Sequence, residues 1–328
     1  MLSFNKSYNY PNVNTNKKPI AEIFKNDKPF GYIYFTNDEN EDEGTESDEY
    51  ESSEDSESDN PFKCEYCKRV FSCKAARITH QVRNSCKAKI LHDFMKYSKG
   101  DKSESGMLIG LNDVKLSGSM KFRPLADVWN RENIVIIGPQ NSGKSYWTSL
   151  YAQSYQSLFE NDVIIISRIE DDASFKEIKN PVRVSITEEL LSDPIDIKGE
   201  MSPSLTIFDD IDDSRYTPEL SKYVWGLNTE TLVNGRDQSG NGEHIYTITT
   251  MHITEGTKTR KILNEASTIV LFLPIGYQES RILKMYCSLS PQQINKLKKL
   301  KSRWVALNCK YRPQFIMTEK ELFLLAEF

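Results

Sequence analysis

From about Phe122 onward, short runs of apolar residues alternate with longer segments that have the periodicity of helices. Runs of this length are typical of strands that are buried on both faces of a parallel sheet. The apolar runs lie at residues 133–137, 162–166, 204–208, 245–249 and 268–273, and the clearest helix between them is at 144–156. Strands that alternate with helices predict an α/β fold, with a mostly parallel sheet flanked by helices.

The two ends of the chain have different patterns. Residues 1–36 are rich in Asn, Lys and Tyr, with one strand-like patch from Gly31 to Phe35. Beyond the last apolar run we expect a helix at 291–300, a β-hairpin at 303–317 and a final helix that begins at Thr318. No internal repeat is apparent.

Charge is distributed very unevenly along the 328 residues, which include 42 Lys and Arg and 47 Asp and Glu. Thirteen of the acidic residues lie between Asp38 and Asp59, where there is no Lys or Arg, so the rest of the chain has a net charge of about +8 at pH 7. The acidic segment cannot bury enough apolar surface to offset its ordering entropy, which predicts a disordered linker. The basic remainder indicates a polyanionic partner.

Several classes of protein are excluded by composition. No apolar run approaches the roughly 18–20 residues of a membrane span, and the first residues lack the apolar core of a signal peptide. Six cysteines in a chain of this length do not form a disulfide scaffold, so we expect a reducing, intracellular location. We expect an N-terminal segment at 1–36, an acidic linker at 37–60, a metal-binding unit at 61–90, a second linker at 91–121, an α/β core at 122–280 and a basic extension at 281–328.

A glycine-rich loop follows the first strand of the α/β core and precedes its clearest helix. It fits the pattern of Gly, four residues, then Gly-Lys-Ser, with the residues Gly138, Pro139, Gln140, Asn141, Ser142, Gly143, Lys144 and Ser145. Such a loop points backbone N–H groups at phosphate oxygens, and the helix N-terminus adds its positive dipole end. The lysine reaches the β- and γ-phosphates, and the serine hydroxyl ligates Mg²⁺. The loop predicts binding of a nucleoside triphosphate such as ATP, with Mg²⁺.

A second acidic element for such a site ends the strand at 204–208. Asp209 is the candidate for the metal side, and Asp210 is the candidate base that orients the attacking water. Many hydrolytic P-loop proteins place Glu at the second position, and Asp212 and Asp213 are close enough to compete for the role.

The strand at 245–249 continues into polar residues. In P-loop ATPases with an additional strand, this strand lies between the first and the acidic one, and its end faces the γ-phosphate. Thr250 or His252 is then a candidate sensor of the phosphate or of its attacking water, and a surface histidine at a strand end is the alternative for His252.

Residues 61–90 have the spacing of a ββα zinc finger. The candidate Zn²⁺ ligands are Cys64, Cys67, His80 and Cys86, with Cys in place of the usual last His. The segment is basic, which favours phosphate contact, but the helix positions that usually contact bases are Cys73, Ala76 and Thr79. We therefore expect non-specific nucleic-acid docking or contact with protein, with neither favoured.

The order of these motifs resembles the genome-packaging ATPases of large DNA viruses, which belong to the FtsK–HerA superfamily. The matching segments are GPQNSGKS, LTIFDDID, NGRDQSGNGEH before TITTMH, and TRKILNEAS before an apolar strand. The resemblance implies ATP-driven translocation of double-stranded DNA through a homo-oligomeric ring, in the virion or the host cytoplasm, with capsid or core proteins as partners and no membrane. It also implies a catalytic set of Lys144, Asp209, Asp210, His252 and Arg260.

The resemblance leaves two assignments open. His252 lies where the family usually has a polar residue, often Gln, and either Arg260 or Arg236 is the candidate arginine finger for a neighbouring subunit's site. From Arg281 to Arg312 there are nine Lys and Arg and no acid, a candidate DNA surface or the solvated face of a helix.

Three hypotheses follow from the sequence. The favoured one is a DNA-translocating packaging ATPase. The alternatives are a helicase-like or AAA-type P-loop ATPase without a packaging role, and a zinc-finger adaptor whose nucleotide site is regulatory.

Overall fold

The computed structural model describes residues 2–6, 17–36, 107–110, 112–236, 244–252 and 257–328. The predicted acidic linker and the predicted zinc finger, with its ligands Cys64, Cys67, His80 and Cys86, lie outside the described residues. In the described part of the chain, no helix combines the length and the apolarity that crossing a bilayer requires.

Half of the main sheet is parallel, as the alternating pattern predicts. In sheet order its strands are β12 (Thr268–Phe272), β7 (Asn133–Ile137), β11 (Ile245–Met251), β10 (Ser204–Phe208), β8 (Asp162–Ser167) and β9 (Val182–Ser185). Every neighbouring pair among them is parallel. All five predicted runs are strands, and β11 lies between β7 and β10, as expected for an additional strand. The short, largely exposed β9 was not predicted.

The other half of the sheet is antiparallel. Beyond β12 the order is β13 (Trp304–Asn308), β14 (Phe315–Met317), β15 (Glu321–Leu324), β5 (Asp113–Leu116) and β4 (Met107–Ile109), which makes eleven strands in all. Each neighbouring pair from β12 to β4 is antiparallel. The predicted hairpin is confirmed as β13 and β14. The prediction of a mostly parallel sheet holds for only one half, so the sheet as a whole is mixed.

The helix predicted from Thr318 is wrong. The chain turns at Thr318, whose backbone N–H donates to the Glu321 carbonyl at 2.7 Å, and β15 then pairs with both β14 and β5. Leu322 is fully buried between these partners, and only a 3₁₀ turn, η4 (Leu325–Glu327), follows. The Leu, Glu and Ala residues favour a helix locally, but pairing on two sides overrides that preference.

The N-terminal segment forms a second, antiparallel sheet with the residues just before the α/β core. Its four strands, in order, are β1 (Leu2–Lys6), β3 (Lys28–Thr36), β2 (Lys17–Lys25) and β6 (Met120–Arg123). The strand-like patch at Gly31–Phe35 is part of β3, whereas the other three strands were not predicted. A buried ion pair between Lys18 and Asp127 joins this sheet to the segment that leads into β7.

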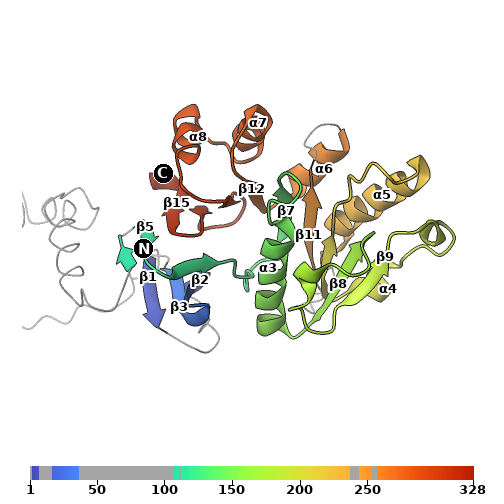
Figure 1. Ribbon diagram of the computed structural model, residues 1–328, viewed down its shortest axis with the longest axis horizontal. Helices are drawn as coiled ribbons and strands as arrows, with labels where there is room; N and C mark the ends of the chain where they lie inside the picture. The colour runs from blue at the N-terminus through green and yellow to red at the C-terminus, as the bar shows by residue number, and fades with distance from the viewer. Residues whose placement is uncertain (1, 7–16, 37–106, 111, 237–243, 253–256) are drawn as a thin grey trace, which may run out of the picture.

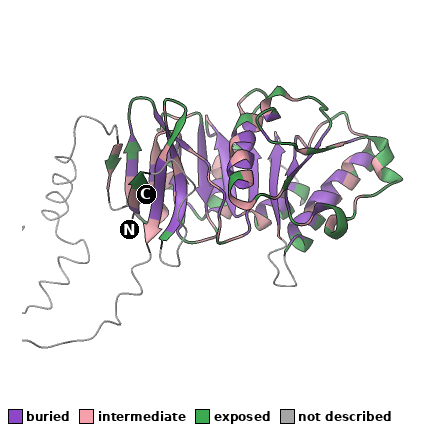
Figure 2. Ribbon diagram, turned by 90° about the horizontal axis from the view of Figure 1, so that it is seen from below, coloured by how far each residue is buried: buried purple, intermediate pink, exposed green. Residues whose placement is uncertain are grey.

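Two apolar cores lie on the two faces of the main sheet. Alternate residues of β7 contribute to each: Ile134 and Ile136 belong to one core, Val135 and Ile137 to the other. The first core contains α3 (Lys144–Phe159) and the small sheet, and the second contains α5 (Pro218–Asn234), α6 (Thr257–Glu265), α7 (Tyr277–Tyr286) and α8 (Pro291–Leu297). Figure 1 shows these elements around the sheet, and Figure 2 shows the buried strands between more exposed helices.

The predicted helices at 144–156 and 291–300 are α3, which extends three residues further, and α8, which ends at Leu297. The shorter elements are η2 (Ala173–Phe175), η3 (Glu188–Leu191) and α4 (Ile197–Met201). Because β7, β11 and β10 are parallel neighbours, the residues that follow each of them meet at one edge of the sheet.

Candidate nucleotide-binding site

The glycine-rich loop connects β7 directly to α3, as the sequence predicts. Gly143 has φ 105°, in the region that glycine adopts without steric cost, and the helix begins with Lys144. A Cβ atom on Gly138 would lie 2.8 Å from both the Phe272 Cβ and the Ser142 Oγ atoms. Both glycines are therefore required by the shape of this loop.

The side chain of Lys144 is held by hydrogen bonds to the backbone of its own loop. Lys144 is only 6% exposed, and its ammonium donates to the carbonyl oxygens of Gly138 at 3.2 Å and Pro139 at 3.4 Å. The same nitrogen lies 2.9 Å from His252 Nε2 and 3.7 Å from Asp210 Oδ1. A buried ammonium that is bonded mainly to neutral acceptors favours an additional anionic ligand.

The hydroxyl of Thr250 links the two acidic residues that follow β10. Thr250 Oγ1 accepts a hydrogen bond from the backbone N–H of Asp210 at 2.8 Å and donates to Asp209 Oδ1 at 2.9 Å. Asp209 is 2% exposed, and burial, followed by the nearby Asp210, raises its pKa to about 6. Asp210 is about one-third exposed and has φ 47°, which turns the chain sharply at the end of the strand.

Asp209 has a further neighbour that sequence reasoning missed. Ser167, the last residue of β8, lies with its Oγ 3.4 Å from Asp209 Oδ2. Ser167 could have been found from the sequence, because it is a polar residue directly after an apolar run, as Thr250 is.

The two later acids after β10, Asp212 and Asp213, have separate partners. Asp212 Oδ2 accepts the backbone N–H of His252 at 2.7 Å, and Asp212 Oδ1 lies 3.4 Å from His252 Nδ1. Asp213 is bonded to Arg215, which lowers the pKa of its carboxyl, and lies 4.0 Å from Arg168. Of the acids beyond Asp209, Asp210 is thus the one that contacts the Lys144 ammonium.

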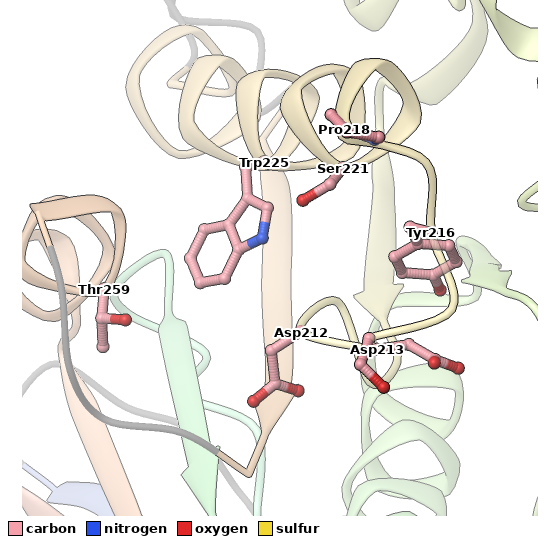
Figure 3. Close-up of a pocket in the computed structure, with 8 residues that line it drawn as sticks. Asp212, Asp213, Tyr216, Pro218, Ser221, Trp225 and Thr259 are labelled. Atoms are coloured by element: carbon pink, nitrogen blue, oxygen red, sulfur yellow. The ribbon is translucent and has the colours of Figure 1, made fainter.

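A pocket of about 340 Å³ lies beyond these acids, between the loop after β10, the first turns of α5, and α6. Figure 3 shows Asp212, Trp225 and Thr259 around it. The Tyr216 hydroxyl is buried there without a hydrogen-bond partner among the described residues. Because the Asp212 carboxylate lines the pocket and also bonds His252, a group that enters the pocket would lie next to the His252 end of the site.

The two candidate arginines lie at opposite edges of the sheet. Arg260 is exposed on α6, which starts shortly after β11 ends beside the glycine-rich loop. Arg236 follows α5 and is next to Gly235, whose carbonyl accepts the N–H of Ile245 at the start of β11. The Arg236 guanidinium forms an ion pair with Glu265 at 2.9 Å. Arg260 is therefore on the helix that starts at the sheet edge where the candidate nucleotide site lies, and Arg236 lies at the opposite edge of the sheet.

The residues fit a Mg²⁺-bound nucleoside triphosphate. The Ser142 Oγ atom in the loop is buried and has no partner among the residues that the structure describes, so it is available to a phosphate oxygen. No group of three or more His, Cys, Asp or Glu side chains in that same part of the chain could hold a metal alone. Mg²⁺ is usually bound through one or two protein ligands together with substrate phosphates. Ser145 and Asp209 would be these ligands.

No model of a known protein family matches the chain. Among solved structures, the genome-packaging NTPase B204 of Sulfolobus turreted icosahedral virus 2 in complex with AMPPCP is 17% identical, with a TM-score of 0.39 over 58% of this chain and 97% of that one. The pCW3 conjugation coupling protein TcpA is 10% identical, with a TM-score of 0.39 over 67% of each chain. The ATPase EccC of Thermomonospora curvata is 12% identical, with a TM-score of 0.35 over 61% of this chain and 24% of that one.

The match to a protein of Sputnik virophage is much closer in sequence. The uncharacterized protein V3 of that virophage is 33% identical over 204 residues, which make up 61% of this chain and 79% of V3. The chain belongs to the same protein family as Sputnik virophage V3.

Proposed function

We propose that this protein hydrolyses ATP and couples hydrolysis to the translocation of double-stranded DNA, as in the packaging of a viral genome. The observation that supports this most strongly is the meeting of Lys144, Asp210 and His252 at the edge of the sheet where β7, β10 and β11 end. A phosphate loop, two strand-end carboxylates and a polar sensor are the parts that phosphoryl transfer to water requires.

Each part has a role in this proposal. Backbone N–H groups of the loop beyond Pro139 and the Lys144 ammonium bind the β- and γ-phosphates, and Mg²⁺, which Ser145 and Asp209 would hold, would supply charge stabilisation there. Asp210 orients the attacking water and accepts its proton. Thr250 and His252 link the position of the water to that of the γ-phosphate.

An arginine from a second copy of the chain would complete the site. Arg260 suits this role better than Arg236, because it is exposed on α6 at the edge where the phosphates bind. A fixed guanidinium at the transferring phosphoryl group is worth roughly 10³–10⁵ in rate. The proposal therefore includes a homo-oligomeric ring in which neighbours share sites.

The DNA-translocating part of the proposal is supported by the motif order in the sequence and by the basic charge outside the acidic segment. The relative V3 belongs to a virophage, which is consistent with a role in a virion or in a viral factory in the host cytoplasm. The predicted zinc finger, with Zn²⁺ on Cys64, Cys67, His80 and Cys86, would add a non-specific nucleic-acid or protein contact, including contact with capsid or core proteins.

The proposal is tested by measuring ATP hydrolysis with and without long duplex DNA, for the full chain and its Lys144→Ala variant. We expect hydrolysis that duplex DNA stimulates in the wild type and that falls to background in the variant. Lys176→Ala, which changes an exposed lysine next to η2, is the control and should retain full activity.

The alternatives give different results in the same assay. Equal rates with and without DNA would contradict translocation, and nucleotide binding without hydrolysis would favour the adaptor with a regulatory site. DNA-stimulated hydrolysis accompanied by strand separation would favour a helicase-like enzyme.

A further inference from the structure

We propose that the α7–α8 hairpin and the turn after it form the surface that contacts the phosphate backbone of duplex DNA, and that Phe272 and Trp304 connect this surface to the phosphate loop. We name this the hairpin surface, and its cations are Arg281, Lys284, Lys298, Lys299 and Lys301. The inference rests on the proposed function, which it extends by naming the DNA-contacting element.

The cations of the hairpin surface are available to an external anion. All five are exposed, and none forms an ion pair with a carboxylate in the part of the chain that the structure describes. Two nearby cations are excluded because their charged groups already have partners: Lys296 donates to the backbone oxygen of Phe328 at 2.6 Å, and Arg303 is paired with Glu319 at 2.7 Å. Between Tyr277 and Arg303 the only acid is Glu279, which caps the N-terminus of α7.

The hairpin presents these cations on a rigid base. Ile282 and Leu283 of α7 and Ile294 and Leu297 of α8 are buried in the core on that face of the sheet. Ser290 caps α8 through a capping box with Gln293. On α7 the exposed residues Tyr277, Arg281 and Lys284 are spaced i, i+4 and i+7, so they follow one stripe of the helix.

The composition of this surface favours a duplex over a single strand. Single-strand sites combine basic grooves with several aromatic side chains on which bases stack. Here there are five cations, and one large aromatic side chain, Tyr277, is strongly exposed, at 84%. Non-specific duplex binding depends mainly on Lys and Arg contacts to phosphates, which such a surface provides.

The hairpin begins and ends next to the nucleotide site. It connects the end of β12 to the start of β13, at the edge where the phosphate loop follows β7, and Figure 1 shows α7 and α8 side by side beyond β12. Phe272, the last residue of β12, lies so close to the loop that a Cβ on Gly138 would be 2.8 Å from its Cβ atom.

The other end of the hairpin contacts the helix that starts from the loop. Trp304, the first residue of β13, makes an edge-on ring contact with Trp147 in the first turn of α3, with the ring centroids 6.2 Å apart. The two ends of the hairpin are joined by the hydrogen bond from the Leu273 N–H to the Arg303 carbonyl, at 2.9 Å. A shift of the phosphate loop or of α3 would therefore be transmitted to both ends of the hairpin.

The test compares two triple variants of the full chain. Lys298→Gln, Lys299→Gln and Lys301→Gln together remove charge from the hairpin surface, and Lys176→Gln, Lys179→Gln and Lys222→Gln remove the same charge from exposed positions elsewhere. Duplex affinity is measured by fluorescence anisotropy over a range of salt concentrations, with basal ATP hydrolysis and melting temperature as controls. If each lysine contacts one phosphate, the slope of log K against log salt falls by about 2 to 3 in the hairpin variant only.

The hairpin surface and the proposed function can be contradicted separately. A hairpin variant that binds duplex DNA and responds to it like the wild type and the control variant would overturn the hairpin surface while leaving the proposed function intact. A wild type that hydrolyses no ATP, or whose hydrolysis is indifferent to DNA, would overturn the proposed function itself. If the hairpin variant lost basal hydrolysis, the charges would act at the nucleotide site and the proposal would be wrong.

The connection to the loop has its own test. Trp304→Phe keeps an apolar ring but reduces the contact with Trp147, because the phenyl ring is smaller than the indole. We therefore expect duplex affinity to be unchanged and the fold-stimulation of hydrolysis by DNA to fall. Unchanged stimulation in this variant, which is conservative enough to keep the fold, would contradict transmission through Trp304.

Discussion

The Lys144 ammonium lies 2.9 Å from Nε2 of His252, so the lysine of the phosphate loop and the residue that directly follows β11 are in direct contact. Because a charged ammonium can only donate, Nε2 accepts and the imidazole proton is on Nδ1. Nδ1 faces Asp212 Oδ1 at 3.4 Å and Asp210 Oδ1 at 3.7 Å, and both carboxylates favour that tautomer. The geometry therefore connects the loop lysine, through one imidazole, to the acids after β10.

Replacing this imidazole should slow hydrolysis. A hydrogen bond to a charged group is worth about 1.5–3 kcal/mol, so His252→Ala is expected to lower kcat roughly 10- to 100-fold. His244→Ala changes the residue before the other end of the same strand and should leave kcat unchanged. Steady-state kinetics on both variants makes the comparison. Equal kcat values for His252→Ala and the wild type would show that this contact plays no part in turnover.

The Asp210→Asn and Asp213→Asn variants should differ sharply in kcat. Asp210 lies near Lys144 and is partly open to solvent, whereas Asp213 is bonded to Arg215. We expect Asp210→Asn to lower kcat by about 100-fold or more, in the range typical of general-base catalysis, with little change in nucleotide affinity. Asp213→Asn should change kcat only slightly. The reverse pattern would assign the base to Asp213.

Thr250→Val should remove the link between Asp209 and Asp210 while nearly keeping the volume of the side chain. The hydroxyl bonds both the Asp210 N–H and the Asp209 carboxylate, and a buried carboxylate that loses a partner costs about 1–3 kcal/mol. We expect reduced kcat together with lower stability in urea unfolding, and Thr250→Ser should restore both. Failure of Ser to rescue would mean that the methyl group, not the hydroxyl, is what the site needs.

Asp209 should make the fold less stable as the pH rises. Burial raises its pKa from 3.8 to about 6, so the folded state binds the proton more tightly than the unfolded state. Stability from this group is therefore greatest below about pH 4, falls as the pH rises from 3.8 to 6, and then levels off at a cost of about 3 kcal/mol.

Asp209→Asn removes this cost, so the variant should be more stable than the wild type at pH 8 and have no advantage at pH 4. Urea unfolding without nucleotide at both pH values measures the difference, and the same variant should lose Mg²⁺-dependent hydrolysis. A variant that is less stable than the wild type at pH 8 would show that the Asp209 carboxylate stabilises the fold.

Most strands of the parallel half and the position of the phosphate loop could be predicted from sequence, because residues that are adjacent in sequence determine them. Gly138, Gly143 and Lys144 belong to one motif that is contiguous in sequence, and runs such as residues 204–208 are buried on both faces. Asp209 and Asp210 follow from the same logic, since a carboxylate that directly ends a buried strand must lie at its edge.

The remaining elements depend on partners that are distant in sequence. The strand β15 has helix-forming residues, and its extended form depends on pairing with β5, about 200 residues away. The strands β1 and β2 each pair with β3 in the small sheet, and β2 pairs on its other side with β6, from the segment before the core. The contact between Lys144 and His252 could be suspected from the position of His252 at the end of a strand. The bond between His252 and Asp212 could not, because it depends on the turn that the chain makes at Asp210, where φ is 47°.

Nucleotide binding by the phosphate loop is measured most simply by counting the ATP molecules bound per chain, in equilibrium dialysis of the full protein against Mg·ATP. We expect one nucleotide per chain for the wild type and for Lys176→Ala, and none for Lys144→Ala at the same concentration. Absence of bound nucleotide in the wild type, or equal binding by Lys144→Ala, would contradict this expectation.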